Sequence, residues 1–189
     1  IKTANVHLNK DNIDVLNEYD LILDCTDNLQ TRFLINDYCK KYNKEWVYSA
    51  AIKNSGYVFP ILKNGPCLQC FLEEKKNLET CSTAGVLNTI TTSIAALQTT
   101  LVMKLILENN VEPILYHYNI WQQDFKKIKI KKRKNCLTCN NQFNYLEKNN
   151  QGTIKFCAAG KFQIQGNNID KEKIKQRWEK LGDVIDDGI

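Results

Sequence analysis

The amino-acid sequence predicts an α/β fold with a partly parallel sheet and flanking helices, and three observations lead to this prediction. A short apolar run, Asp20–Asp24, precedes a segment whose apolar residues have helical spacing, 29–42, and a second apolar run, Trp46–Ala51. A strand, a helix and a strand at this spacing form a βαβ unit, whose two strands are parallel. Further apolar runs of strand length and one long apolar helix follow, enough to extend the sheet and to cover it.

The elements after this unit follow in order along the chain. Residues 56–62 form a strand-like run, in which Pro60 indicates an edge strand or a strand end. A long helix is predicted from about Val86 to Glu108, because its apolar residues share one helical face. Two more strands are expected at 114–118 and 125–130. In the second of these, isoleucines alternate with lysines, as in a strand with one solvated face.

The chain is expected to divide into three parts. Residues 1–140 contain the elements described above and form the main domain. Residues 141–152 are polar and lack a regular pattern, which indicates a linker. Residues 153–189 predict a small extension made of a β-hairpin and a helix. Because the chain begins with Ile1 and ends in a loop-like segment, we expect a fragment that is cut at both ends.

Composition and charge exclude several classes of protein. Hydrophobic residues make up 43% of the chain, and Gly and Pro number only 8 and 3, which argues against a disordered or collagen-like protein. The formal net charge of +5 is too small to indicate nucleic-acid binding by itself. The longest apolar stretch, Val86–Leu107, is interrupted by several polar residues, so we expect a core helix and no membrane span.

Four of the eight cysteines form two C-x2-C pairs, Cys67 with Cys70 and Cys136 with Cys139. Two such pairs complete a tetrahedral four-cysteine zinc site, and a site closed by four protein ligands is structural. Two redox pairs or a chance spacing are the alternatives. Because paired and single cysteines occur together, the pattern favours a reduced, cytoplasmic protein with a metal site over a disulfide framework.

Asp27 is a candidate ligand for the magnesium ion of a nucleotide. It lies where an apolar strand ends and a helix begins, which is where open α/β sheets bind ligands. A carboxylate there can hold Mg²⁺ on phosphates, and the helix N-terminus stabilises the remaining negative charge. Plain helix capping, shared with Asn28, is the alternative interpretation.

Cys81 is a candidate nucleophile or sulfur acceptor. It precedes the long helix, whose N-terminal dipole lowers the pKa of a nearby thiol. An inert small residue is the alternative. The other single cysteines are expected to be structural: Cys25 and Cys39 as buried strand and helix residues, and Cys157 as a hairpin residue.

The run Lys126–Lys134 carries seven positive charges and no acidic residue. Basic clusters of this kind contact nucleic acids when aromatic residues are interleaved with them, and none are interleaved here. The alternation of lysine and isoleucine already explains the run as a solvated strand face. Nucleic acid is therefore an unfavoured partner.

Four segments stand in a fixed order along residues 3–140: Tyr19–Asn28 followed by Thr31–Asn36, then Gly65–Cys70, Thr80–Val86 and Asn135–Cys139. Together they resemble the ThiF/MoeB/HesA family, relatives of ubiquitin-activating enzymes. The first segment is similar to the family's aspartate motif and its helix. The second and fourth segments resemble its two zinc knuckles, and the third resembles its crossover-loop cysteine segment.

The resemblance implies a Rossmann-like sheet that binds ATP and Mg²⁺. It implies adenylylation of the C-terminal glycine of a ubiquitin-like sulfur carrier that ends in Gly-Gly, of the MoaD or ThiS type, for molybdopterin or thiamine biosynthesis. Asp27 would be the aspartate that binds Mg·ATP, with Asn28 beside it, and Cys81 would be the loop cysteine. The resemblance also implies a homodimer.

The sequence departs from the family in two respects, one of which is the extension after Gln151. The family's N-terminal half, which carries its glycine-rich nucleotide loop, would precede Ile1. We therefore expect residues 1–189 alone to be inactive. Two other functions fit part of the pattern. One is a non-catalytic, zinc-stabilised adaptor that binds a ubiquitin-like protein, and the other is a zinc-containing nucleic-acid module that uses Lys126–Lys134.

Overall fold

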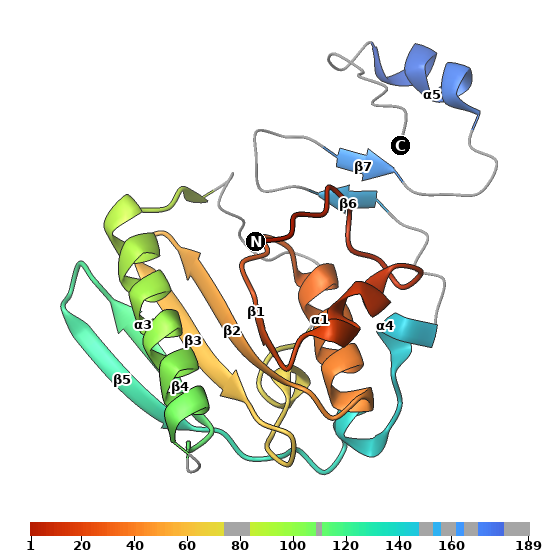
Figure 1. Ribbon diagram of the computed structural model, residues 1–189. Coiled ribbons are helices and arrows are strands. Elements are labelled where there is room, and N and C mark those ends of the chain that lie inside the picture. The colour runs from red at the N-terminus through yellow and green to blue at the C-terminus, as the bar shows by residue number, and fades with distance from the viewer. Residues whose placement is uncertain (74–83, 109–110, 148–152, 156–161, 165–169, 180–189) are drawn as a thin grey trace.

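The computed structural model describes residues 1–73, 84–108, 111–147, 153–155, 162–164 and 170–179 (Figure 1). A five-stranded sheet with the order β1-β2-β3-β4-β5 forms its centre. The strands are β1 (Leu21–Leu23), β2 (Glu45–Ile52), β3 (Ser55–Ile61), β4 (Ile114–Asn119) and β5 (Asp124–Lys129). The predicted α/β fold is confirmed, and each strand lies within one residue of its expected bounds.

The sheet is partly parallel, as predicted. β1 and β2 run parallel, with Ile22 opposite Trp46, and α1 (Leu29–Lys41) connects them. The pairs β2–β3, β3–β4 and β4–β5 are antiparallel. Parallel neighbours need a crossover such as a helix between them, whereas the β2–β3 and β4–β5 hairpins close with short turns.

α1 covers one face of the sheet. It begins at Leu29 because Asn28 caps it: Asn28 Oδ1 accepts a hydrogen bond from the Thr31 backbone N–H at 2.8 Å. Phe33 and Tyr38 of α1 are almost completely buried, in a cluster that also contains large residues of β2 and β3. Burial of these aromatic side chains stabilises the helix on the sheet.

α3 (Asn88–Leu107) covers the opposite face. Its Ile94 and Leu101 pack with Val47 of β2 and Val58 of β3, whereas the residues that flank these valines in the strands pack with α1. Successive side chains of a strand point to opposite faces, so the two helices lie on opposite sides of the sheet. A short 3-10 helix, η1 (Ile13–Glu18), precedes β1.

The long helix differs from the prediction in two ways. It begins at Asn88, two residues later than expected, and its apolar residues are not confined to one face. Met103, Ile106 and Leu107 are 50%, 70% and 81% exposed. By length and composition alone, α3 is the one helix among the described residues that is long and apolar enough to cross a membrane. One face of α3 packs on β2 and β3, and its buried residues are Ile90, Ile94, Gln98 and Leu101.

Pro60 marks a strand end rather than an edge strand. It lies in the central strand β3, but pairing of β3 with β4 stops at Val58, so no partner on that side requires an N–H from Pro60. β5 is the edge strand next to β4, and its residues are mostly exposed.

The C-terminal part contains the predicted hairpin and helix. β6 (Thr153–Lys155) and β7 (Phe162–Ile164) pair in an antiparallel sheet of their own, and α5 (Lys171–Trp178) follows. Inside the segment expected to be a linker, α4 (Asn144–Glu147) forms. Tyr145 stacks on Phe33 of α1, with ring centroids 5.0 Å apart, and this contact holds α4 on the main sheet unit.

A substitution at Gly56 tests how closely α3 packs on the sheet. A Cβ atom at Gly56 would lie 2.3 Å from Ile94 Cγ1 and 3.0 Å from the Ala50 carbonyl oxygen. We expect Gly56→Ala to lower the free energy of unfolding by roughly 1–3 kcal/mol, because overpacking displaces α3. This change in the free energy of unfolding is measured by urea titration, with circular dichroism as the signal.

Gly65→Ala is the matched control. The nearest atom to its Cβ is Leu62 Cβ at 3.4 Å, an ordinary contact, so this variant should change stability by no more than about 0.5 kcal/mol. Equal stability of the two variants would show that α3 does not pack this closely against β3.

Candidate functional site

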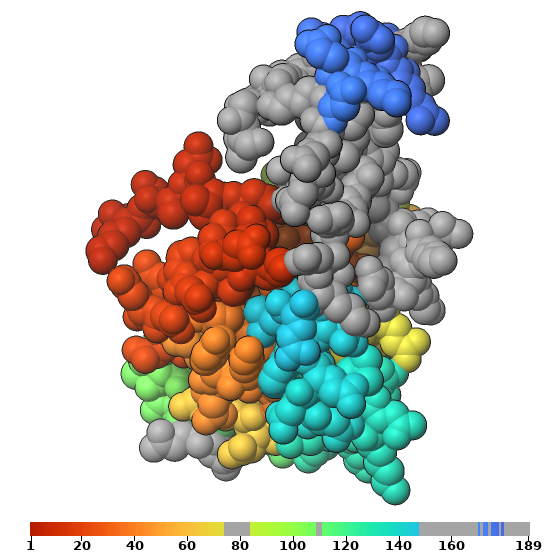
Figure 2. Space-filling view, turned by 90° about the vertical axis from the view of Figure 1, so that its right-hand side faces the viewer, coloured from red at the N-terminus to blue at the C-terminus, as the bar shows by residue number. Residues whose placement is uncertain are grey.

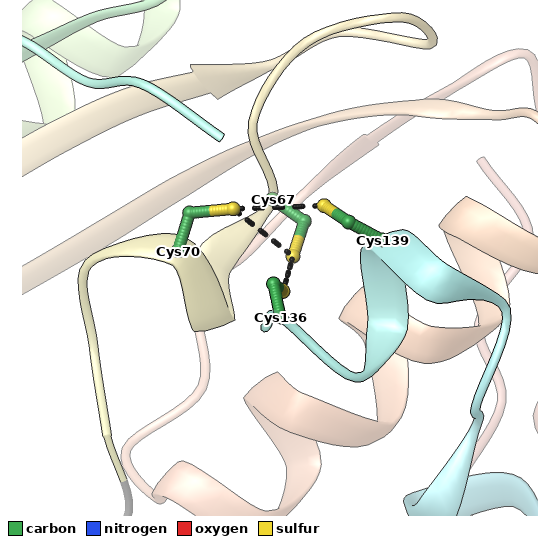
Figure 3. Close-up of side chains that lie close together, drawn as sticks. All are labelled: Cys67, Cys70, Cys136 and Cys139. Carbon is green, nitrogen blue, oxygen red and sulfur yellow. Dashed lines mark hydrogen bonds between the residues drawn. The ribbon is translucent and has the colours of Figure 1, made fainter. Parts of the chain in front are cut away.

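Two cysteine turns that are far apart in the sequence meet at one end of the sheet. Cys67 and Cys70 lie after β3, where Gly65–Pro66 turns the chain and η2 (Leu68–Cys70) forms. Cys136 and Cys139 lie after β5, in a turn that includes η3 (Thr138–Asn140). Figure 3 shows the four side chains converging on one point. The structure thus brings together the four cysteines that the sequence spacing singled out.

The distances between the sulfur atoms fit a bound metal ion. All four lie within 4.8 Å of one another. Cys67 Sγ is 4.0 Å from Cys70 Sγ and 3.4 Å from Cys136 Sγ, and Cys70 Sγ is 3.5 Å from Cys139 Sγ. Zinc at about 2.3 Å from each of four tetrahedral ligands places neighbouring sulfurs about 3.8 Å apart. Four protein ligands would leave no open position for a substrate.

The crowded thiols differ in acidity. Burial raises the pKa of Cys136 to about 11. Hydrogen bonding to the thiols of Cys139 and Cys70, together with burial, raises the pKa of Cys67. Hydrogen bonds from the thiols of Cys139 and Cys67 lower the pKa of Cys70. A dication bound by the four sulfurs would replace the thiol protons, since metal ligation requires the thiolate form.

Two asparagines shape the second cysteine turn. Asn140 Nδ2 donates hydrogen bonds to the carbonyl oxygens of Lys134 and Cys136, both at 2.9 Å. Asn141 ends η3 with a φ of 61°, in the left-handed region that asparagine tolerates better than most residues. The local sequence therefore favours the tight turn that Cys136 and Cys139 need.

A buried ion pair organises the other candidate site, at the carboxyl end of β1. Asp24 is 0% exposed, and its carboxylate accepts hydrogen bonds from the Thr26 backbone N–H at 2.8 Å and the Thr26 hydroxyl at 2.7 Å. Arg32 Nε donates to the other carboxylate oxygen at 3.0 Å. Arg32 also donates to the carbonyl oxygens of Thr26 and Ser49, and it lies over the Tyr48 ring. Arg32 thereby ties α1 to β2 and to the turn after β1.

The backbone of Asp24 is held as well. Its carbonyl oxygen accepts hydrogen bonds from Ser49 Oγ and from Gln98 Nε2, both at 2.9 Å. Gln98 Nε2 also donates to the Val47 carbonyl oxygen at 3.0 Å. Gln98 is a buried polar residue of α3, so β1, β2, α1 and α3 all meet at Asp24.

Asp27 lies in the exposed turn between this strand end and α1. The structure assigns the helix cap to Asn28, whose amide oxygen binds the Thr31 N–H, while Asn28 Nδ2 contacts Asp27 Oδ1 at 3.4 Å. The first turn of α1 contains no acidic residue. An exposed carboxylate beside the positive end of a helix suits a cation that is bound to an anionic ligand.

The single cysteines differ from the predictions in one case. Cys25 is exposed and not buried, because β1 ends at Leu23 and Cys25 already lies in the turn that Asp24 holds. Burial of part of its side chain and the Asp24 carboxylate raise the pKa of Cys25, which makes it a poor nucleophile. Cys39 is buried, as predicted. Cys81 and Cys157 lie outside the described residues.

The basic run Lys126–Lys134 lies on the edge strand β5 and the segment after it. Lys126 pairs with Asp124 at 2.9 Å, Lys129 pairs with Glu112 at 3.2 Å, and Arg133 pairs with Glu73. These local ion pairs are exposed. They favour the solvated strand face over a nucleic-acid site.

Sequence reasoning missed the residues that support both sites. The sequence pattern did not single out Asp24 and Arg32. Asp24 resembles a helix cap because it stands at a strand end, and its partner Arg32 lies on another element.

Asn36 and Asp37 were missed in the same way. Both are 0% exposed in α1, and burial raises the pKa of Asp37 to about 6 although Thr138 and Tyr145 donate hydrogen bonds to it. A useful signal was available: Asn28, Arg32 and Asn36 recur every four residues in an otherwise buried helix.

The sequence is similar to those of several curated proteins. The chain is 33% identical over 147 residues to "Adenylyltransferase and sulfurtransferase MOCS3" of Culex quinquefasciatus, which covers 74% of this chain and 34% of the relative. It is 27% identical over 165 residues to "Sulfur carrier protein ThiS adenylyltransferase" of Bacillus subtilis, covering 84% and 49%. The chain thus spans half or less of the length of these curated relatives.

Solved structures support the fold. The Escherichia coli enzyme MccB with bound ATP matches with a TM-score of 0.55 at 15% identity, over 71% of this chain and 44% of that one. MccB in complex with N-formylated MccA matches with a TM-score of 0.56 at 14% identity, over 71% and 46%. The model of the ThiF family matches residues 1–139. The chain therefore belongs to the ThiF family.

Proposed function

We propose that this chain is part of an ATP-dependent adenylyltransferase that activates the C-terminal glycine of a ubiquitin-like sulfur carrier. The site at the carboxyl end of β1 gives this proposal its main support. Asn28 caps α1, so the Asp27 carboxylate remains exposed at the carboxyl end of β1. In open α/β sheets, this is the position at which nucleotides bind. Relatives named as adenylyltransferases and membership of the ThiF family support the reaction class.

The proposed reaction transfers AMP to a carboxylate. The terminal carboxylate of the carrier attacks the α-phosphorus of ATP, and a bond forms between this oxygen and phosphorus. The bond from the α-phosphorus to the bridging oxygen breaks, and pyrophosphate leaves with its electrons. The product is an acyl-adenylate, whose AMP group a sulfur donor can displace. Catalysis of this kind depends on positioning and on neutralising phosphate charge.

The residues of this chain would act by binding the magnesium ion of ATP and by holding the turn at the end of β1. Asp27 would bind Mg²⁺, which would neutralise charge on the phosphates of ATP. Asp24 and Arg32 hold the backbone of the turn that carries Asp27, through the hydrogen bonds at Thr26. The positive end of α1 would stabilise phosphate charge near Asn28. Cys81, outside the described residues, remains the proposed loop cysteine.

We propose that the four-cysteine cluster binds a structural Zn²⁺ ion. The sulfur distances and the absence of an open ligand position support it. The zinc would fasten the segment after β5 to the turn after β3 and would take no part in adenylylation. All six described cysteines are free of disulfides, which supports a reducing, cytoplasmic location.

The proposed partners are a sulfur carrier that ends in Gly-Gly and a second copy of the chain. A carrier of the MoaD or ThiS type would place the enzyme in molybdopterin or thiamine biosynthesis. The exposed apolar residues of α3, among them Met103, Ile106 and Leu107, support burial of its outer face in a homodimer. We propose neither a membrane nor a nucleic acid as a further partner.

ATP–pyrophosphate exchange tests the proposed reaction. It is measured on the whole protein that carries this chain, with and without a carrier that ends in Gly-Gly, and residues 1–189 serve as a further sample that should be inactive. Asp27→Asn should lower carrier-dependent exchange by about 100-fold or more, since it removes a charge that acts at the phosphates. Asp20→Asn, an exposed carboxylate before β1, is the matched control and should keep the activity.

Exchange that survives Asp27→Asn would contradict the proposed role of Asp27. Carrier binding without any exchange, from a folded and metal-loaded protein, would favour the non-catalytic adaptor. Binding to a nucleic acid that weakens steeply with salt would favour the nucleic-acid module.

Metal analysis tests the zinc proposal. Residues 1–189 purified without chelators should contain one zinc per chain by elemental analysis. Cys67→Ser and Cys136→Ser should lose most of it, because each removes a thiolate ligand. Cys25→Ser should retain it, since Cys25 lies outside the cluster. Retention of zinc by both ligand variants would place the metal elsewhere.

A further inference from the structure

Two adjacent polar residues in the middle of α1, Asn36 and Asp37, are completely buried. A buried amide or carboxylate needs hydrogen-bond partners, because water no longer provides them. Both side chains find partners in the cysteine turns and in α4, so they connect α1 to parts of the chain about 30 to 110 residues away in sequence.

Asn36 contacts both cysteine turns. Its Oδ1 accepts a hydrogen bond from the Leu68 backbone N–H at 2.8 Å, and Leu68 directly follows Cys67. Its Nδ2 donates to Thr138 Oγ1 at 3.4 Å, and Thr138 directly precedes Cys139. A single amide therefore lies between the two metal-binding turns.

Asp37 fixes the second turn on the helix. The Thr138 hydroxyl donates a hydrogen bond to Asp37 Oδ1 at 2.6 Å, and the Tyr145 backbone N–H donates to Asp37 Oδ2 at 2.9 Å. Thr138 is 0% exposed, so its hydroxyl depends on these partners. Figure 2 shows the segment that carries the second turn and α4 lying against α1.

We propose that Asn36, Asp37 and Thr138 form an outer shell that holds the two cysteine turns at the spacing that one metal ion requires. The inference rests on the metal-binding part of the proposed function. Cys70 and Cys136 are separated by 65 residues of sequence, and each turn alone offers only two sulfurs. Hydrogen bonds from one rigid helix to both turns preorganise the four sulfurs, so metal binding does not have to order them.

The competing explanation is that these residues only anchor α1 and add to overall stability. The two explanations differ in what they predict for metal affinity. An outer shell controls affinity directly, and changes to such residues weaken metal binding by typically 10–100-fold. An anchor lowers the stability of the fold while the four sulfurs, once folded, bind metal as before.

Three variants of residues 1–189 separate these explanations. Thr138→Val keeps the shape of the side chain but removes the hydroxyl that contacts Asn36 and Asp37. Asn36→Leu removes the hydrogen bonds of the amide to both cysteine turns. Gln98→Leu is the matched control, because it removes a buried amide with two hydrogen bonds on the opposite face of the sheet.

Zinc affinity is measured by competition with a chromophoric chelator, and Co²⁺ loading reports the ligand set through its thiolate absorption. Thr138→Val and Asn36→Leu should bind zinc about 10–100-fold more weakly and keep the spectrum of four thiolates. Gln98→Leu should unfold at lower urea concentration but bind zinc within about twofold of the wild type, because distant sites act independently.

Wild-type zinc affinity in Thr138→Val and Asn36→Leu would overturn the proposal, and so would an equal loss of affinity in Gln98→Leu. If Asn36→Leu does not fold, Thr138→Val alone decides. The wild-type chain could also bind no zinc although the thiols of the cluster, Cys67, Cys70, Cys136 and Cys139, react with a thiol reagent. That result would overturn the metal site itself, and the outer shell with it.

Discussion

The ion pair between Asp24 and Arg32 is the constraint on which the functional side of the fold depends. Asp24 is completely buried, and a buried carboxylate that loses its cationic partner strongly destabilises a protein. Its backbone carbonyl is also fixed, by hydrogen bonds from Ser49 of β2 and Gln98 of α3. Because the strand end is held in this way, the chain leaves it through a short turn in which Asp27 stays exposed.

α1 connects this strand end with the four-cysteine cluster. Asn28, Arg32 and Asn36 follow one another at intervals of four residues and therefore share one side of the helix. Asn28 and Asn36 are separated by about 12 Å along the helix axis. The two sites at either end of this polar side have different chemistry. The strand end exposes a carboxylate that can take an anionic ligand through a cation, whereas the four cysteines could hold a metal ion as its complete ligand set, with no position left open.

The sequence is informative where local patterns decide the structure. The strands and α1 were predictable because apolar runs end at polar residues, and the cysteine cluster was predictable because two C-x2-C pairs have the spacing of metal ligands. The network around Asp24 was not, since its partners come from three other elements. The outer face of α3 was also missed, because periodicity does not reveal a helix that is apolar on both sides. Cys25 looked buried because it adjoins an apolar strand, but it follows the strand's last residue and is exposed.

We propose that this chain belongs to an enzyme that transfers AMP to the terminal carboxylate of a sulfur carrier. Intact mass spectrometry of the carrier tests it most directly, after incubation of the carrier with ATP, Mg²⁺ and the whole protein in the absence of a sulfur donor. The carrier should gain one AMP at its C-terminal glycine, and a mutant carrier without that glycine should gain none. A carrier that stays unmodified, or that gains a phosphate instead of AMP, would contradict it.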